Sequence, residues 1–333
     1  MGGPIGILAN PASGKDIRRL VANASVFDNR EKRSIVRRVV LGAIAAGARE
    51  FVYMPDSHGI AASALEALDQ EAAVRELEIP RKGSALDTSR AAERMREAGV
   101  SVAITLGGDG TSRAFALGWP SAPLVAISTG TNNVFPKMIE GTVAGAAAGL
   151  VASGAIAIEE VARQAKMVHV TFEDGREDLA LIDVALLDGP FVGARAIWDA
   201  GSLRALVLAR AEPAAIGMSS VGGLLHPVSS DADEGLVVEV GSTGTTLLAP
   251  ITPGQHSKVP IAGHRCLALG EPCELHGPGI LAFDGEREHR LMAGQRVVLT
   301  VRRDGPLVID VPRTLQLAAC RGIFRTDGDT HGD

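Results

Sequence analysis

The chain has 333 residues, of which 46% are hydrophobic and only 3% aromatic, so its core must be built from Ala, Val, Leu and Ile. The length is enough for two domains of ordinary size. The net charge of −6 argues against a general nucleic-acid binder. The sequence holds no apolar run of about 18 residues, so we expect no membrane span.

The three cysteines, Cys266, Cys273 and Cys320, are too few and too scattered for a disulfide framework or a metal knuckle. We interpret them as reduced thiols of a cytoplasmic protein. The first residues lead directly into an apolar strand, so a secretory signal is not expected. We also expect a homo-oligomer.

The first part of the chain alternates apolar runs with helical periodicity. Strands are predicted at 5–9, 50–54, 74–79, 102–104 and 124–127, and helices at 16–24, 28–46, 60–69, 84–98, 111–117 and 142–153. This alternation predicts a Rossmann-like α/β domain with a doubly wound parallel sheet over residues 1–145.

From residue 166 the pattern becomes β-rich, with a period of two. Strands are predicted at 167–172, 179–187, 236–240, 245–251, 258–262, 280–283 and 296–302, with one helix at 190–208. Gly and Pro between the strands are typical of a sandwich. We therefore expect a β-rich domain over 146–312 and a C-terminal segment, 313–333, that packs back on the first domain.

Polar loops follow three of the predicted parallel strands. NPASGK at 10–15 follows the first strand, GGDGT at 107–111 the fourth and STGTNN at 128–133 the fifth. The carboxyl ends of parallel strands meet at one edge of a sheet, so the loops can converge on one cleft. Taken singly, the first loop is also an ordinary strand-to-helix connection, and it lacks the spacing of a P-loop.

The GGDGT loop combines glycines with one acidic residue. Gly107, Gly108 and Gly110 let backbone N–H groups approach a phosphate at a helix N-terminus. Asp109 would repel bare phosphate, but it suits a divalent cation that bridges phosphates, or a hydroxyl that must lose a proton. The alternative is a tight turn in which Asp109 caps the next helix.

The helix at 28–46 is basic, since it carries Arg30, Lys32, Arg33, Arg37 and Arg38. We interpret these side chains as a solvated face, with a phosphate-facing patch as the alternative.

Taken together, the three loops resemble the NPxSG, GGDGT and GTxND signatures of the superfamily that joins NAD kinases to diacylglycerol and sphingosine kinases. AFDGERE at 282–288 is similar to the DGE element of the lipid-kinase branch. Residues 22–33 and 128–136 look like the acetoin catabolism protein X branch, which is described as ATP-NAD-kinase-like. The likeness covers most of residues 5–325.

This resemblance implies a two-domain kinase with its site in the interdomain cleft, Mg²⁺ as cofactor and ATP as phosphoryl donor. It implies catalytic roles for Asp109 and Glu286 and a metal-linked role for Asp284. It places the remaining candidates around the nucleotide: Asn10, Ser13, Gly14, Gly107, Gly108, Gly110, Thr111, Gly130, Thr131, Asn132, Asn133 and Asp183.

The sequence departs from the family patterns at two positions. Val134 stands where lipid kinases have an Asp, and Ile182 stands where NAD kinases have an Asn that holds the dinucleotide. Ile cannot hydrogen-bond an adenine or a ribose, so the NAD assignment weakens. Asp183 can still bind a ribose hydroxyl, or it merely flanks a strand. Residues 218–223 match a substrate loop of NAD kinases only loosely, and we interpret them as a turn between strands.

The leading hypothesis is a small-molecule kinase that transfers a phosphoryl group from ATP or polyphosphate to a hydroxyl, with NAD to NADP as the nearest named activity. A lipid, diacylglycerol-type or other polyol kinase is the first alternative. A non-catalytic nucleotide-binding sensor linked to acetoin catabolism is the second. The expected partners are a nucleotide and a small-molecule acceptor.

Replacing Asp109 with Asn separates its two interpretations. A catalytic Asp109 predicts a fall in turnover of about 10²-fold or more with little change in folding. A helix cap predicts a loss of stability of up to about 1 kcal/mol with activity retained.

Overall fold

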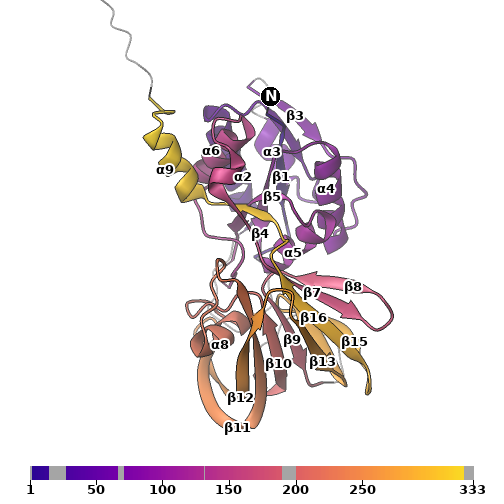
Figure 1. The fold of residues 1–333 in the computed structure, drawn as a ribbon. Coiled ribbons are helices and arrows are strands. Elements are labelled where there is room, and N and C mark those ends of the chain that lie inside the picture. Colours follow the sequence, from indigo (N-terminus) through magenta and orange to yellow (C-terminus); the bar gives the residue numbers. More distant parts are fainter. Residues whose placement is uncertain (1, 15–27, 67–70, 131, 190–199, 326–333) are drawn as a thin grey trace, which may run out of the picture.

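Figure 1 shows two halves of different architecture, an α/β half in the upper part of the view and a β-rich half below it. This computed structural model describes residues 2–14, 28–66, 71–130, 132–189 and 200–325. The helix predicted at 16–24 lies outside the described residues.

The α/β half is built on a sheet of seven strands in the order β3-β2-β1-β4-β5-β17-β6. All run parallel except β6, which is antiparallel to β17. β1 and β4 are buried at every position because helices cover both faces of the sheet. The doubly wound parallel sheet is therefore confirmed. Its strands are β1 Ile5–Ala9, β2 Glu50–Tyr53, β3 Ala73–Glu76, β4 Val102–Gly107, β5 Pro123–Ser128, β6 Ala162–Gln164 and β17 Leu307–Ile309.

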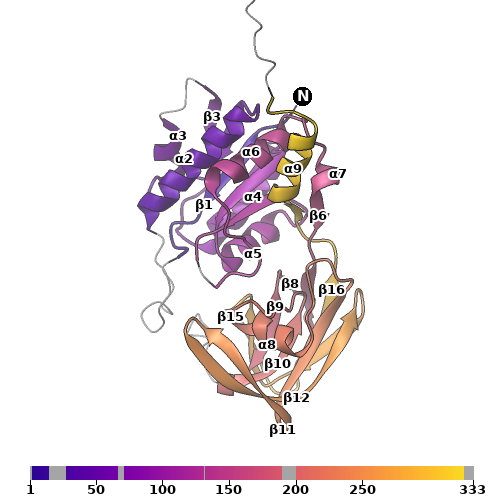
Figure 2. The same cartoon turned by 90° about the vertical axis from the view of Figure 1, so that its left-hand side faces the viewer.

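One core joins the sheet to helices α2, α3, α6 and α9, and a second core joins its other face to α4 and α5. In Figure 2, α9 lies beside α6, which it contacts. None of the described helices has the length and apolar character needed to cross a membrane. The helices of this half are α2 Asn29–Ala45, α3 Ile60–Leu65, α4 Ala85–Glu97, α5 Asp109–Gly118, α6 Gly141–Ala152, α7 Ile158–Val161 and α9 Val311–Cys320.

The β-rich half consists of two antiparallel sheets, in the orders β12-β11-β10-β9-β14-β15 and β13-β16-β7-β8. Apolar side chains of both sheets form one core, and helix α8 (Met218–Leu225) packs on the other face of the six-stranded sheet. The predicted β-rich, sandwich-like second half is confirmed. Its strands are β7 Met167–Phe172, β8 Glu177–Ala180, β9 Asp183–Leu187, β10 Leu203–Leu208, β11 Glu234–Thr252, β12 Gln255–Ala268, β13 Pro272–His276, β14 Gly279–Phe283, β15 Glu286–Leu291 and β16 Arg296–Arg302.

The strands predicted at 236–240 and 245–251 are one strand, β11, and three further predicted elements of this half are wrong. The strand at 179–187 is two strands, β8 and β9, because the N–H groups of residues 181 and 182 bind the Asp284 carboxylate instead of a neighbouring strand. The described part of the helix at 190–208 ends in strand β10, which pairs with β9 and β11. Residues 218–223 are helix α8, which covers the six-stranded sheet, and not a turn.

Two strands of the seven-stranded sheet come from the later part of the chain. β6 and β17 come from within 146–312, yet they extend the sheet of the first half. The chain thus crosses between the halves twice, once after β6 and once before β17. The boundaries at 145 and 312 stay a prediction.

Candidate functional site

The loops that follow β1, β4 and β5 are tied to one another by side-chain hydrogen bonds. The Asn10 amide donates to Thr111 Oγ1 over 2.8 Å, which joins the first loop to the GGDGT loop. The hydroxyls of Ser13 and Thr129 are 2.9 Å apart, which joins the first loop to the third. Since the loops share one sheet edge, their polar groups form a single surface.

A buried lysine of helix α2 donates hydrogen bonds to the loop that follows β1. Lys32, on α2, is fully buried, and its ammonium donates to the carbonyl oxygens of Asn10 (2.8 Å) and Ser13 (2.6 Å). The prediction of a solvated basic face on this helix is therefore wrong for Lys32. Lys32 lies among the buried residues of this helix, and carbonyl oxygens take the place of water around its ammonium.

Asp109 joins the GGDGT loop to the loop after β5. It is the first residue of α5, and its carboxylate accepts N–H hydrogen bonds from Val134 (3.0 Å) and Phe135 (2.8 Å). Its own N–H donates to Asn133 Oδ1 over 3.3 Å. The carboxylate thus orders the neighbouring loop, a role that the sequence did not predict.

The glycines of the GGDGT loop have close neighbours, and the nearest is Thr111, whose Cβ would lie 2.4 Å from a Cβ at Gly107. A Cβ at Gly108 would lie 2.8 Å from Asn133 Oδ1, and a Cβ at Gly110 would lie 2.9 Å from Glu286 Oε1. Glu286 belongs to β15, so the β-rich half reaches the N-terminal end of α5. The structure therefore brings Glu286 and the GGDGT loop together from opposite halves.

Asp284 precedes Glu286 in the tight turn between β14 and β15. Asp284 and Gly285 both have positive φ (48° and 85°), as a two-residue primed hairpin turn requires. The Asp284 carboxylate accepts N–H hydrogen bonds from Leu181 (2.9 Å) and Ile182 (2.7 Å). Burial raises its pKa to about 7, although these donors and Arg113 favour the charged form.

Asp183 lies next to Asp284 and is only 6% exposed. Burial, followed by the charges of Asp284 and Asp109, raises the pKa of Asp183 well above its ordinary value. Its Oδ1 is buried and accepts no hydrogen bond within the described residues. Three carboxyl groups, those of Asp109, Asp183 and Asp284, therefore share one region.

Ile182 is 1% exposed and packs in the core that joins the two halves. Its side chain therefore supports the interface between the halves. It offers no polar group where the NAD kinase pattern has an Asn.

A second buried contact joins the halves next to these acids. Arg113 of α5 donates to Leu179 O (2.6 Å) and to the Asp178 carboxylate (2.8 Å), and its guanidinium lies over the Phe283 ring. His289 binds the other oxygen of Asp178 over 2.9 Å. Burial raises the pKa of Asp178, but His289 and Arg113 outweigh it, so the pKa lies below its ordinary value. Nothing in the sequence pattern identifies Arg113, because its partners come from the other half.

The remaining candidates also lie in these loops. Gly14 adopts a positive φ of 75° just after Ser13, and the Gly130 carbonyl accepts the Ser128 hydroxyl over 2.7 Å. Asn132 is partly buried beside Asn133, and Gly107 packs against Thr111. Thr131 lies outside the described residues.

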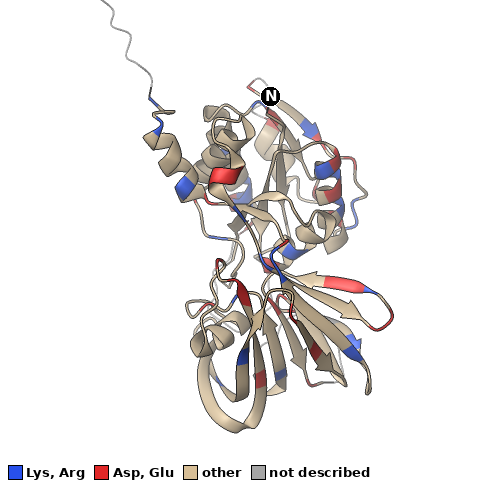
Figure 3. Ribbon diagram, viewed as in Figure 1, with Lys and Arg blue, Asp and Glu red and all other residues tan. Residues whose placement is uncertain are grey.

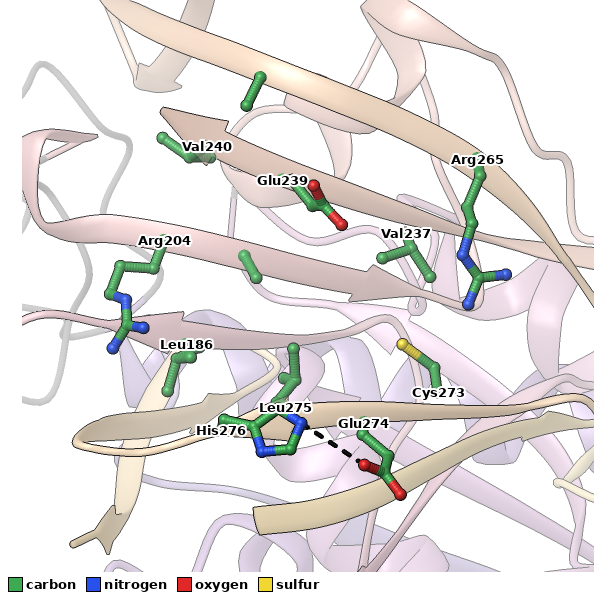
Figure 4. A pocket seen from close by; sticks show the side chains of 12 residues that line it. Leu186, Arg204, Val237, Glu239, Val240, Arg265, Cys273, Glu274, Leu275 and His276 are labelled. Carbon is green, nitrogen blue, oxygen red and sulfur yellow. Dashed lines mark ion pairs between the residues drawn. The ribbon is translucent and has the colours of Figure 1, made fainter. Parts of the chain in front are cut away.

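The distribution of charge and one cavity in the β-rich half were compared with the predicted site residues. Lys and Arg alternate with Asp and Glu over both halves (Figure 3). A cavity of about 460 Å³ lies between β10–β11 and β13, where Glu274 and His276 form an ion pair of 3.4 Å (Figure 4). None of the predicted site residues lines this cavity.

The fold and the loop signatures are those of the NAD kinase class. Residues 5–156 match the family model of the ATP-NAD kinase N-terminal domain. The crystal structure of yeast NADH kinase complexed with NADH superposes with a TM-score of 0.51 at 14% identity, covering 98% of this chain and 89% of that chain. This likeness shows a shared fold.

The particular family follows from the second half and from the full-length match. Residues 166–304 match the model of the acetoin catabolism protein X C-terminal domain. Acetoin catabolism protein X of Cupriavidus necator is 36% identical over 337 residues, which cover 97% of this chain and 94% of the relative. The chain belongs to the acetoin catabolism protein X family, as the sequence motifs predict.

Proposed function

We propose that this chain transfers a phosphoryl group from ATP or polyphosphate to a hydroxyl. The observation that carries the proposal is the approach of Glu286, from the β-rich half, to Gly110 in the GGDGT loop. Asp109, Asp183 and Asp284 lie beside this contact and act on one another electrostatically. Family membership and fold support a kinase-type function, since residues 5–156 match an NAD kinase model.

In this proposal the three loops hold the nucleotide. Phosphate oxygens lie at the N-terminal end of α5, where backbone N–H groups and the helix dipole favour negative charge. Asn10, Ser13, Thr111 and Asn133 keep the loops in place around it. Thr131 and Asp183 complete the proposed nucleotide contacts.

The carboxyl groups suit a divalent cation that accompanies the phosphates. Mg²⁺ prefers oxygen ligands, and the buried Asp183 Oδ1 accepts no hydrogen bond among the described residues. Asp284 would hold the ion, with Asp183 beside it, and the ion would neutralise phosphate charge. Asp109 or Glu286 orients the acceptor hydroxyl and takes its proton, and catalysis rests mostly on positioning and electrostatics.

NAD is the nearest named acceptor in this proposal, because the family model is that of ATP-NAD kinase. Ile182 weakens this assignment, since its buried side chain cannot hydrogen-bond a dinucleotide. A lipid or other polyol therefore remains the alternative acceptor. A nucleotide-binding sensor without turnover is the alternative from another class.

An acceptor screen tests the proposal. The purified chain is incubated with Mg²⁺ and ATP labelled in its terminal phosphate, together with a panel of dinucleotides, polyols and lipids. We expect Mg²⁺-dependent transfer of label to one class of acceptor. ATP binding without transfer to any member of the panel would favour the sensor.

A further inference from the structure

A cluster of three potential metal ligands lies in the β-rich half and includes none of the carboxyl groups described above. His226 follows α8, Glu234 begins β11, and Cys266 lies on β12. His226 Nε2 lies 3.3 Å from Glu234 Oε1 and 3.4 Å from Cys266 Sγ, and all three ligand atoms are within 4.8 Å of one another. Figure 1 shows α8, β11 and β12 side by side in the β-rich half.

These spacings agree with those of a zinc centre. Zn–N and Zn–O bonds of about 2.0–2.1 Å place tetrahedral N and O ligands about 3.4 Å apart, and a Zn–S bond of about 2.3 Å places N and S about 3.5 Å apart. The side chains therefore need little movement to bind one ion. His226 and Glu234 are partly exposed and Cys266 is exposed, so an ion and a completing water can reach them.

The backbone that carries these ligands is held in place by buried or multiple contacts. Lys166, only 1% exposed, donates to the Glu234 carbonyl over 2.6 Å. Arg303 donates to the carbonyl of Ala232 (2.8 Å) and to the Asp233 carboxylate (2.9 Å), which fixes the turn before Glu234. Leu236 pairs with Cys266 across β11 and β12, so the register places Glu234 and Cys266 on the same face.

We propose that His226, Glu234 and Cys266 bind one zinc-class ion, with water in the fourth position. Thiolate and imidazole ligands select Zn²⁺ or Co²⁺ over Mg²⁺, which takes oxygen ligands. This site is therefore chemically distinct from the carboxyl cluster between the halves. The ion would link the end of α8 to the two long strands and stabilise the β-rich half.

Titration of the reduced, chelator-treated full chain with Co²⁺ tests the proposal, because Co²⁺ reports its ligands by absorption. We expect one equivalent to produce intense tetrahedral bands and a thiolate-to-cobalt charge-transfer band, and one equivalent of Zn²⁺ to abolish both. Cys266→Ser should remove the charge-transfer band and weaken binding by more than about tenfold, since loss of an outer-shell partner alone costs about 10–100-fold.

Cys320→Ser is the matched control, because Cys320 is also exposed but lies on α9. It should leave the spectrum and the affinity unchanged. If Cys266→Ser fails to fold by circular dichroism, Glu234→Gln carries the test: it should keep the charge-transfer band and weaken binding. Co²⁺ binding without a charge-transfer band, or a titration that Cys266→Ser and Glu234→Gln both leave unchanged, would overturn the proposal.

Discussion

At the scale of single residues, the buried carboxyl groups make stability depend on pH. Burial raises the pKa of Asp183 and Asp284, so the folded chain holds these protons more tightly than the unfolded chain does. Their contribution to stability is complete below an unfolded pKa of about 3.9 and is lost as the pH rises through the folded pKa, which is about 7 for Asp284.

Asp183→Asn should therefore flatten the pH dependence. As the pH rises from about 5 to about 7, the free energy of unfolding of the unmodified chain should fall more steeply than that of the variant. Urea unfolding across this range measures both slopes. Asp188→Asn, at the exposed end of the same strand, should keep the original slope. Equal slopes in all three proteins would contradict the account of Asp183.

At the scale of elements, α2 supports the first loop through Lys32. Lys32→Met keeps the apolar stem but leaves the carbonyls of Asn10 and Ser13 without their buried donor. We expect a loss of stability of about 1–3 kcal/mol and weaker ATP binding, measured by thermal unfolding and calorimetry. Arg33→Met is the control, because Arg33 is exposed on the same helix. If both variants behave alike, Lys32 does not hold the loop.

Local patterns predicted the elements of the first half well because its strands are short and apolar and alternate with helices. These patterns failed where contacts between residues far apart in the sequence determine the type or the bounds of an element. The break between β8 and β9 depends on Asp284, about a hundred residues away, and β10 is a strand because β9 and β11 flank it. The predicted strands do not include β15, although Asp284-Gly285 is a strong hairpin signal.

In the candidate site, too, local sequence patterns predicted some features, and contacts between distant residues determine the others. Loop positions followed from sequence order, and the hydrogen bonds among Asn10, Ser13, Thr111 and Thr129 bring the loops together. The hydrogen bonds of Lys32 and Arg113 could not be predicted from the sequence, because both residues resemble surface residues there. Their burial depends on carbonyl and carboxylate partners that only the folded chain supplies.

At the scale of the molecule, Arg113 and Asp178 fasten the two halves together. Their side chains are only 7% and 12% exposed, so Arg113→Met takes the guanidinium away from a buried carboxylate, which keeps its contacts with His289 and with the Leu179 N–H. We expect a loss of stability of about 3–5 kcal/mol in urea unfolding. Arg94→Met, which breaks an exposed pair with Glu97, should cost at most about 1 kcal/mol. Equal losses would show that the buried pair does not fasten the halves.

We propose that acids from both halves act on a nucleotide held by the GGDGT loop. Asp109→Asn tests it, but stability no longer separates the two interpretations of Asp109, because its carboxylate also binds the N–H groups of Val134 and Phe135. We therefore expect some loss of stability from this variant whether or not Asp109 is catalytic, contrary to the expectation from sequence.

The direct measurement is Mg²⁺-dependent phosphoryl transfer by the unmodified chain and by Asp109→Asn, with ATP affinity determined by calorimetry on the same samples. We predict that the unmodified chain transfers phosphate, and that the variant binds ATP with similar affinity but turns over at least about 100-fold more slowly. An unmodified chain that binds ATP without transfer, or a variant with the unmodified rate, would contradict the account.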